Sequence, residues 1–575
     1  MKRIINILSI AVIALSASAC MDLSPKAQLS DAQVWSNASN FSLFANQFYG
    51  WTRDFQGSTS ANYMNGVYDG VHSDERSDIF GTSQLNVYSQ GTNSIPTSDA
   101  NYNTLYKRIY YTNLLLKNAA EFEPKADIAI PTGEAYFFRA YLYFELVQIF
   151  GNVIYATEPL DMDSERLYGE RDNRLTVIRG CVDDLKKAVE LLPDMPTEDG
   201  RVAKGAANAL LSRIALYEGT WQKFHGGDAA ASNELLATAA AAAKAVIDSK
   251  AYTLFYSDAL GPKDSYRYLF ILENTDCNPA KLTKADNKEY IFARRHDEAT
   301  KTIGANITHM AQNSEAYVTR KMADMYRCQD GLPIAKSPLF QGFGAANSEF
   351  QNRDNRMNGS ILMHDQKYWN NDGKWRTTWT AADEADCLVC NRRSQSGYIN
   401  NKWATERKVD DRNEGYDYPI IRYAEVLLNY AEAVFEKDGS ISDADLDYSL
   451  NVVRLRSNPS MAPLSNALVS GNGLDMREEI RTERTVELYF EGFRIDDLKR
   501  WKTAEVEMPQ DLLGVRMTGT WFGTNWTNQT RPLNSEGSII LYDGRVWAEK
   551  NYLYPIPSDE LQLNPKLGQN DGWNK

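Results

Sequence analysis

A run of amphipathic segments between residues 102 and 247 limits the fold more than any other feature of the chain. In the first segment, Tyr102 to Phe122, the residues Leu105, Ile109 and Leu116 recur at helical spacing and share one face. Further helices of this kind are expected at Glu134 to Phe150, Thr176 to Leu192, Ala203 to Tyr217 and Asn233 to Ile247. Helix pairs in succession, with alanines where neighbours touch, predict a degenerate tetratricopeptide-like array. A generic helical bundle has the same periodicity and remains an alternative.

The segments on either side of this run predict shorter or less regular structure. A first helix is expected from Asp31 to Trp51, followed by a loop region rich in Gly, Ser, Asn and Tyr from Asp54 to Ser98. From Lys250 to Glu414 we expect short strands and irregular loops, before helices return at Pro419 to Glu436 and Leu446 to Arg456. Long loops on a rigid scaffold commonly carry function, so these loop regions are where a ligand is expected.

The N-terminal residues predict an export signal. Lys2 and Arg3 precede an apolar run from Ile4 to Leu15, and small residues then lead to Cys20. The run is too short to span a bilayer, which needs about 20 apolar residues. We therefore expect residues 1–19 to be a lipoprotein signal peptide and Cys20 to be lipidated, while an ordinary signal peptide with an incidental cysteine is the alternative.

Charge and cysteine content argue against several classes of partner and cofactor. The chain has 62 basic and 76 acidic residues, a net charge of -14, and no basic cluster, so nucleic acid is not an expected partner. Cys387 and Cys390 are the only closely spaced cysteine pair, and no second pair completes a zinc site. We expect a local disulfide between them, and neither a metal nor another cofactor.

The stretch from Arg481 to Trp501 combines an apolar stripe with dense charge. Glu487 and Glu491 lie one helical turn apart, a spacing near the lower limit for a glycosidase carboxylate pair. Arg484 and Arg494 flank them, and such neighbours lower the pKa of a carboxyl group that a general acid needs raised. We therefore interpret the stretch as a helix and turn whose charges fix how the C-terminal helices dock, and we do not expect an enzyme.

Six stretches, in this order along the chain, resemble those of the SusD/RagB family, which comprises surface lipoproteins that sit on TonB-dependent transporters of the SusC type. They are Gly133 to Val153, Ala206 to Gly219, Tyr418 to Glu436, Leu450 to Arg456, Ile480 to Trp501 and Tyr552 to Trp573. The resemblance implies a mainly α-helical, SusD-like fold in which four tetratricopeptide-like helix pairs form the scaffold. It also implies one such domain over residues 20–575, with a helical part at about 20–250, a loop-rich ligand region at 251–414, and C-terminal helices and a cap at 415–575.

The same resemblance implies a function. The protein would be lipid-anchored through Cys20 in the outer membrane, exposed at the cell surface and free of catalytic activity. It would capture an oligosaccharide or polysaccharide and deliver it to a SusC-like TonB-dependent transporter. Capture of a peptide, as in RagB-like importers, is the first alternative, and glycoside hydrolysis is a weaker one.

Two loop segments hold the candidate ligand residues. A sugar offers flat apolar faces and hydroxyl edges, so its site requires aromatic rings next to hydrogen-bonding side chains. The predicted ligand residues of the first segment are Trp369, Trp375, Trp379, Asn370, Asp372 and Arg376. Those of the second are Tyr63, Tyr68, Tyr88 and Arg76, with Asn62, Asn65 and Asp69 beside them. The alternative is that the tryptophans form a small core that holds a long loop. Trp521 and Trp526 are weaker candidates.

Overall fold

The computed structural model describes most of the chain beyond the N-terminal segment. The described residues are 34–55, 70–81, 86–305, 307–312, 316–363, 366, 368–369, 375–376, 395–407, 412–526 and 529–574. Within them, no helix is long and apolar enough to cross a membrane.

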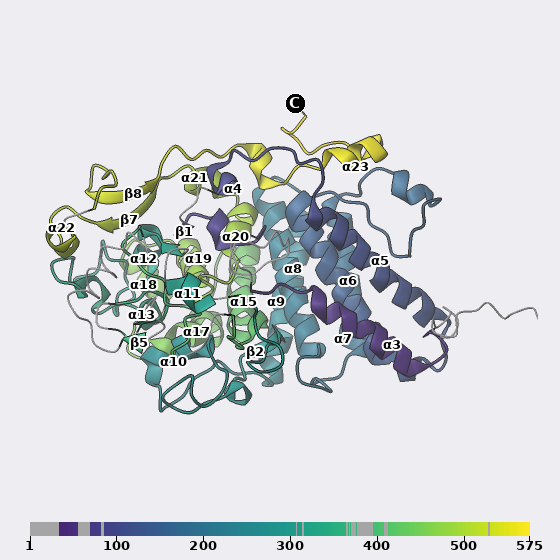
Figure 1. Ribbon diagram of the computed structural model, residues 1–575, viewed down its shortest axis with the longest axis horizontal. Helices are drawn as coiled ribbons and strands as arrows, with labels where there is room; N and C mark the ends of the chain where they lie inside the picture. The colour runs from purple at the N-terminus through teal and green to yellow at the C-terminus, as the bar shows by residue number, and fades with distance from the viewer. Residues whose placement is uncertain are drawn as a thin grey trace, which may run out of the picture.

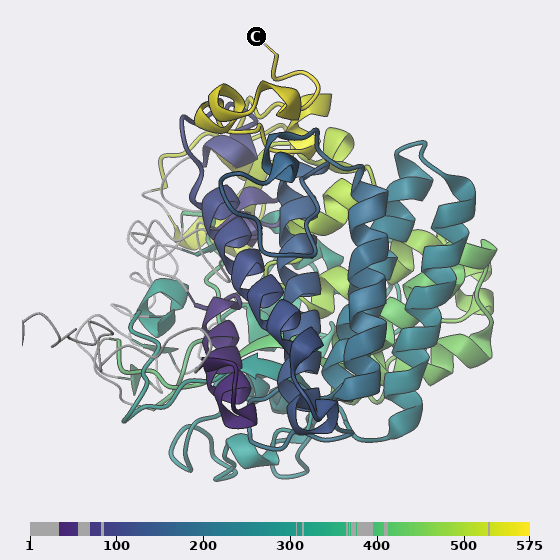
Figure 2. The same cartoon turned by 90° about the vertical axis from the view of Figure 1, so that its right-hand side faces the viewer.

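The N-terminal half is a layer of long helices that pack in sequence order (Figures 1 and 2). They are α3 (Ala38–Ala45), α5 (Ala100–Glu121), α6 (Ala129–Phe150), α7 (Arg174–Leu191), α8 (Lys204–Phe224) and α9 (Ala229–Ser249). Asp99, Asn173 and Asp228 cap the N-termini of α5, α7 and α9, where a side-chain oxygen accepts otherwise unpaired backbone N–H groups. The helices predicted between residues 102 and 247 are thus confirmed, with ends shifted by a few residues.

Packing explains why these sequences form this layer. In α6, apolar residues occupy nearly every side of the helix, and almost all of it from Glu134 to Phe150 is buried between α5 and α7. In α8, Ala206, Ala207 and Ala209 are fully buried, and the lack of bulk at such positions lets neighbouring helices approach closely. One continuous set of buried apolar residues, which begins at Phe41 and ends at Leu567, joins the N-terminal and C-terminal halves.

The C-terminal helices are built around α15 (Tyr423–Asp438), which packs against α8, α9, α17 (Leu450–Ser457) and α19 (Met476–Glu487). The predicted helix Pro419 to Glu436 is wrong at its start, because Tyr418–Arg422 form strand β6. Proline and the β-branched Ile420 and Ile421 favour an extended backbone there, and β6 pairs with β2 (Tyr290–Arg294). The predicted helix Leu446 to Arg456 is likewise interrupted at Ser449.

The stretch from Arg481 to Trp501 forms two helices and a sharp turn. Helix α19 ends at Glu487, and α20 (Arg494–Arg500) begins after Phe490 and Gly492, whose φ angles are 59° and 78°. These left-handed conformations reverse the chain direction and end the apolar stripe that a single helix would have continued.

The remaining elements are short. The strands form two-stranded antiparallel pairs: β1 (Phe80–Gly81) with β3 (Tyr317–Val318), β4 (Tyr368–Trp369) with β5 (Trp375–Arg376), and β7 (Leu512–Arg516) with β8 (Ser538–Tyr542). The short helices are α4 (Val87–Gln90), α10 (Gly261–Leu269), α11 (Ile307–Gln312), α12 (Arg320–Met325), α13 (Asn355–Ser360), α16 (Asp443–Tyr448), α18 (Asn466–Gly471), α21 (Ala504–Glu507), α22 (Trp521–Asn525) and α23 (Ser558–Leu563). The C-terminal segment with α23 crosses the top of the long helices in Figure 1.

A buried ion pair fixes α20 against α15 and leads to a prediction about acid stability. The Arg500 guanidinium contacts the Glu432 carboxylate at 2.5 and 2.8 Å, and Trp501 Nε1 donates to the same carboxylate at 2.6 Å. Burial alone would raise the pKa of Glu432, but Arg500, Arg484 and the Trp501 hydrogen bond together outweigh burial and lower that pKa to about 2. Because this pKa lies below the value of about 4.3 in an unfolded chain, the pair stabilises the fold above pH 4.3.

We predict that this stabilisation is lost as the pH falls from about 5 to 2, because Glu432 then takes up a proton more readily in the unfolded chain. Urea unfolding at pH 7 and pH 3 would measure the effect. The Glu432→Gln variant should be less stable than wild type at pH 7, and the difference should shrink at pH 3. A difference that stays equal at both pH values would contradict the assignment.

Candidate functional site

The tryptophan-rich segment forms a short antiparallel ribbon. Trp369 in β4 pairs with Trp375 in β5, and Tyr368 pairs with Arg376, so the backbone places the two tryptophans directly opposite each other. Residues that are opposite in such a ribbon belong to the same face. The ribbon contacts α11.

Most other predicted ligand residues lie outside the described part of the chain. They are Asn370, Asp372, Trp379, Tyr63 and Tyr68, with Asn62, Asn65 and Asp69. Cys20, Cys387 and Cys390 also lie outside it, so lipidation and the disulfide stay predictions. Cys181, Cys277 and Cys328 are buried free thiols. Among the residues that the structure describes, no group of His, Cys, Asp or Glu has an arrangement that could hold a metal ion.

Arg76 and Tyr88, which the sequence predicts as ligand residues of the second loop segment, pack against each other. The Arg76 guanidinium carbon lies 3.6 Å from the centre of the Tyr88 ring, and the Tyr88 ring stacks on Tyr554 with centroids 5.0 Å apart. Arg76 also donates a hydrogen bond to the Tyr554 hydroxyl. This stack joins the N-terminal loop to the C-terminal segment. Arg76 is only 6% exposed, whereas Tyr88 is half-buried and retains surface that a ligand could contact.

The described residues of the two predicted ligand segments lie in different parts of the molecule. In Figure 1, α4, which contains Tyr88, lies near the top, and β5 lies near the lower left. The structure therefore does not bring Arg76 and Tyr88 together with the ribbon. The contact of Arg76 and Tyr88 with Tyr554 was not predicted from the sequence. The sequence signal for it was two tyrosines in the proline-bounded C-terminal segment.

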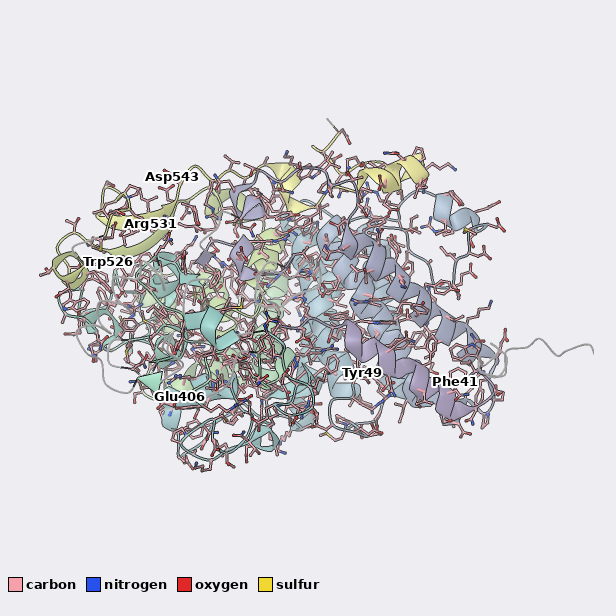
Figure 3. The ribbon with its side chains drawn as sticks, viewed as in Figure 1. Phe41, Tyr49, Glu406, Trp526, Arg531 and Asp543 are labelled. Atoms are coloured by element: carbon pink, nitrogen blue, oxygen red, sulfur yellow. The ribbon has the colours of Figure 1, made fainter. Side chains whose placement is uncertain are left out.

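The weaker candidates Trp521 and Trp526 belong to α22 and its C-terminal end. Trp526 is buried, and Trp521 is half-buried and packs edge to face against Phe522. In Figure 3, Trp526 lies at the same end of the molecule as Arg531 and Asp543, and Phe41 lies at the opposite end. The Trp521 N–H donates to the Phe343 carbonyl at 2.9 Å and α22 contacts β7, so this loop packs on β7 and the loop-rich region.

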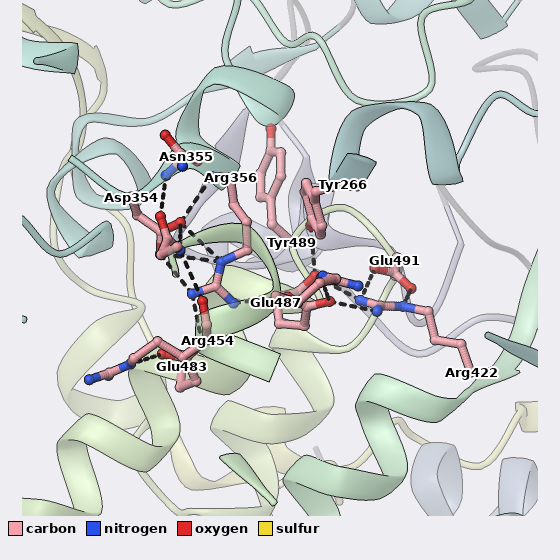
Figure 4. Close-up of polar contacts among 12 residues, drawn as sticks. Tyr266, Asp354, Asn355, Arg356, Arg422, Arg454, Glu483, Glu487, Tyr489 and Glu491 are labelled. Atoms are coloured by element: carbon pink, nitrogen blue, oxygen red, sulfur yellow. Dashed lines mark hydrogen bonds and ion pairs between the residues drawn. The ribbon is translucent and has the colours of Figure 1, made fainter. Parts of the chain in front are cut away.

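Some charges of the Arg481 to Trp501 stretch pair with distant segments of the chain, and others pair within the stretch. Glu487 is fully buried and contacts Arg356, Arg422 and Arg456 at 2.8, 2.7 and 2.6 Å (Figure 4). These arginines come from α13, β6 and α17. Arg494 likewise contacts the distant Asp78 at 2.8 Å. Within the stretch, Asp497 contacts Arg484 at 2.8 Å and Arg500, three positions away, at 2.8 Å.

The network extends from Glu487 to a second set of buried charges. Glu491 contacts Arg422 at 2.8 Å and Lys402 at 2.7 Å. Glu289 contacts both Arg422, at 2.8 Å, and Arg456, at 2.9 Å. Burial lowers the pKa of Lys402 to about 8, even though Glu491 raises it. Each carboxylate in this set therefore faces at least one buried cation.

These electrostatics do not suit a glycosidase pair. Burial alone would raise the pKa of Glu487, but Arg456, Arg422 and Arg356 outweigh it and hold that pKa well below its ordinary value. Arg422 and Lys402 likewise lower the pKa of Glu491 against the effect of burial. A general acid needs a raised pKa and access to the scissile bond, and neither carboxylate has them. The network is built to hold segments together.

Comparison with known families covers both halves of the chain. Residues 288–573 match the SusD family, and residues 21–216 match a family described as starch-binding and associating with the outer membrane. The SusD-like protein P2 of Formosa agariphila is 26% identical over 444 residues, which cover 76% of this chain and 73% of that relative.

Solved structures share the fold. A SusD-like carbohydrate binding protein from Bacteroides fragilis superimposes with a TM-score of 0.72 at 22% identity, covering 93% of this chain and all of that one. A second SusD-like protein from the same organism gives a TM-score of 0.68 at 22% identity, covering 94% of this chain and 98% of that one. At this level of identity the likeness shows the fold alone, and it confirms the mainly α-helical, SusD-like architecture.

Proposed function

The chain belongs to the SusD/RagB family, and from this premise we propose that it is a non-catalytic surface lipoprotein that captures an extracellular oligosaccharide or polysaccharide. It then delivers the glycan to a SusC-like TonB-dependent transporter. The observation that carries the proposal is the family match over both halves of the chain. The name of the Bacteroides fragilis neighbour, a carbohydrate binding protein, supports the choice of ligand.

The ribbon β4–β5 is the part of the chain that we assign to the glycan. Its register sets Trp369 opposite Trp375, and flat indole rings are suited to stacking on the apolar face of a sugar. Asn370, Asp372, Trp379 and Arg376 follow in the same segment and supply a further ring and groups that hydrogen-bond hydroxyls. Tyr88, with Arg76 packed on its ring, is proposed to contact a more distant part of the ligand, because α4 and the ribbon are well separated in Figure 1. Tyr63 and Tyr68 lie outside the described residues and are proposed as ligand residues from the sequence alone.

We predict that the Trp369→Ala and Trp375→Ala variants each bind glycan at least about tenfold more weakly, because each loses a stacking surface worth about 1.4 kcal/mol. Titration calorimetry with maltohexaose, cellohexaose, xylohexaose and mannohexaose would measure the affinities. Trp35→Ala is the matched control and should bind as wild type does, because Trp35 is a half-buried tryptophan that packs on Phe41 of α3.

Three other outcomes would each contradict part of the proposal. Full affinity in both ribbon variants would reject the site. Binding of peptides but of no glycan would favour a RagB-like importer. Release of reducing ends from any of the oligosaccharides would identify a glycoside hydrolase.

Surface anchoring leads to a separate prediction. We propose that Cys20 is lipidated after cleavage of residues 1–19 and holds the protein at the outer membrane. The Cys20→Ser variant should move from the membrane fraction to the soluble fraction and should not incorporate labelled palmitate. Cys277→Ser, which changes a buried thiol, should stay in the membrane fraction. Membrane retention of Cys20→Ser would contradict the anchor.

A further inference from the structure

A groove of about 430 Å³ lies along one face of α5, far from the β4–β5 ribbon in Figure 1. Tyr102, Tyr106, Ile109 and Tyr110 follow helical spacing and line it from below. The loop that follows α6 and the C-terminal helix α23 form its other sides. On this face of α5, Tyr102 and Ile109 are buried, at 5% and 3% exposure, whereas Tyr110 remains exposed to a ligand.

Hydrogen bonds fix the floor of the groove. The Tyr106 hydroxyl donates to the Ile154 carbonyl at 3.3 Å and accepts from the Ile154 N–H at 2.9 Å. The Tyr143 hydroxyl makes the same pair of bonds with Ala156, at 2.8 and 2.7 Å. Because these rings are already held in place, a ligand would not have to order them, and the entropic cost of binding is lower.

Large apolar side chains remain exposed around the rim. Tyr110 is 40% exposed, Tyr168 is 49% exposed and Leu563 is 73% exposed. The Tyr168 hydroxyl donates to the Met162 carbonyl at 3.0 Å, which holds the ring at the mouth of the groove. Scattered exposed apolar residues need no explanation, but three around one concave surface indicate a binding site.

The charges in the groove are acidic. Glu158 and Glu560 line it, and its lining contains no Lys, Arg or His among the residues that the structure describes. Arg171, which lies near Tyr102, is engaged by the Leu567 carbonyl at 2.7 Å and by Asn570 at 2.6 Å. Carboxylates accept hydrogen bonds from hydroxyl groups and repel anions. The groove therefore favours an uncharged, hydroxyl-rich ligand with a flat apolar face.

We propose that this groove is a second saccharide-binding site, which takes the pyranose rings of an uncharged glycan and excludes uronic acids and sulfated sugars. The inference rests on the proposed function and extends it from one site to two. Rings of the glycan stack on Tyr110 and Tyr168, and Glu158 and Glu560 accept bonds from the hydroxyls. Two separated sites on one chain strengthen the capture of a polymer that can reach both, because the second contact is intramolecular.

Hydroxyl-radical footprinting of the full chain, read by mass spectrometry, tests the groove residue by residue. Maltohexaose, cellohexaose, xylohexaose and mannohexaose are the uncharged probes, and hexagalacturonate is the anionic one. An uncharged probe that binds should protect Tyr110 and Tyr168 and leave Tyr256 unprotected. Tyr256 is a matched control because it is 48% exposed and lies outside the groove. Hexagalacturonate should protect none of the three.

Affinity measurements complete the test. In a Trp369→Ala and Trp375→Ala background, adding Tyr110→Ala and Tyr168→Ala should weaken the remaining glycan binding at least about fivefold, and adding Tyr256→Ala should not. Glycan binding that depends on the ribbon but leaves Tyr110 and Tyr168 unprotected would overturn the second site and leave the proposed function standing. Protection by hexagalacturonate would overturn the selectivity for uncharged sugars. Binding of no uncharged probe at all would contradict both proposals.

Discussion

The buried contact between Glu487 and three arginines is the interaction on which the rest of the structure depends. Arg356, Arg422 and Arg456 come from α13, β6 and α17, and all converge on one carboxylate. A buried ion is costly to leave without its partners, about 3–5 kcal/mol for a broken pair, so every alternative arrangement of these segments is penalised. The main effect of the network is therefore to favour one arrangement of the helices over others, and its net contribution to the free energy of folding is smaller.

This constraint separates the scaffold from the ligand surfaces. The network holds the C-terminal helices and the neighbouring loop-rich region, and the Arg500 and Glu432 pair fixes α20 on α15. The chain segments that we assign to glycan lie elsewhere, in the ribbon β4–β5 and along α5. A scaffold held by buried charge allows exposed aromatic residues to change without loss of the fold. The same buried pairing is why Glu487 and Glu491 do not suit a glycosidase carboxylate pair.

Local patterns predicted the helices, and contacts distant in sequence decided the rest. Apolar spacing predicted helices α5 to α9, because each of them buries one face or more. The strand at Tyr418–Arg422 was not predicted, because its partner strand β2 is more than a hundred residues away in the sequence. Partners of Glu487 could not be predicted, since no local rule links it to Arg356. Tyr554 stacks on Tyr88 and accepts a hydrogen bond from Arg76, 478 positions away. The α5 groove was missed because its tyrosines have the same spacing as core residues.

We infer that the Arg481 to Trp501 stretch holds the fold and takes no part in binding. The most direct test compares Glu487→Gln with Glu478→Gln, whose side chain is exposed on the same helix. Urea unfolding and glycan affinity would be measured on the same samples. We predict that Glu487→Gln lowers the free energy of unfolding by about 3 kcal/mol or more, while the folded protein keeps wild-type affinity for glycan. Glu478→Gln should change neither the free energy of unfolding nor the affinity. Unchanged stability together with lost affinity in Glu487→Gln would contradict this inference.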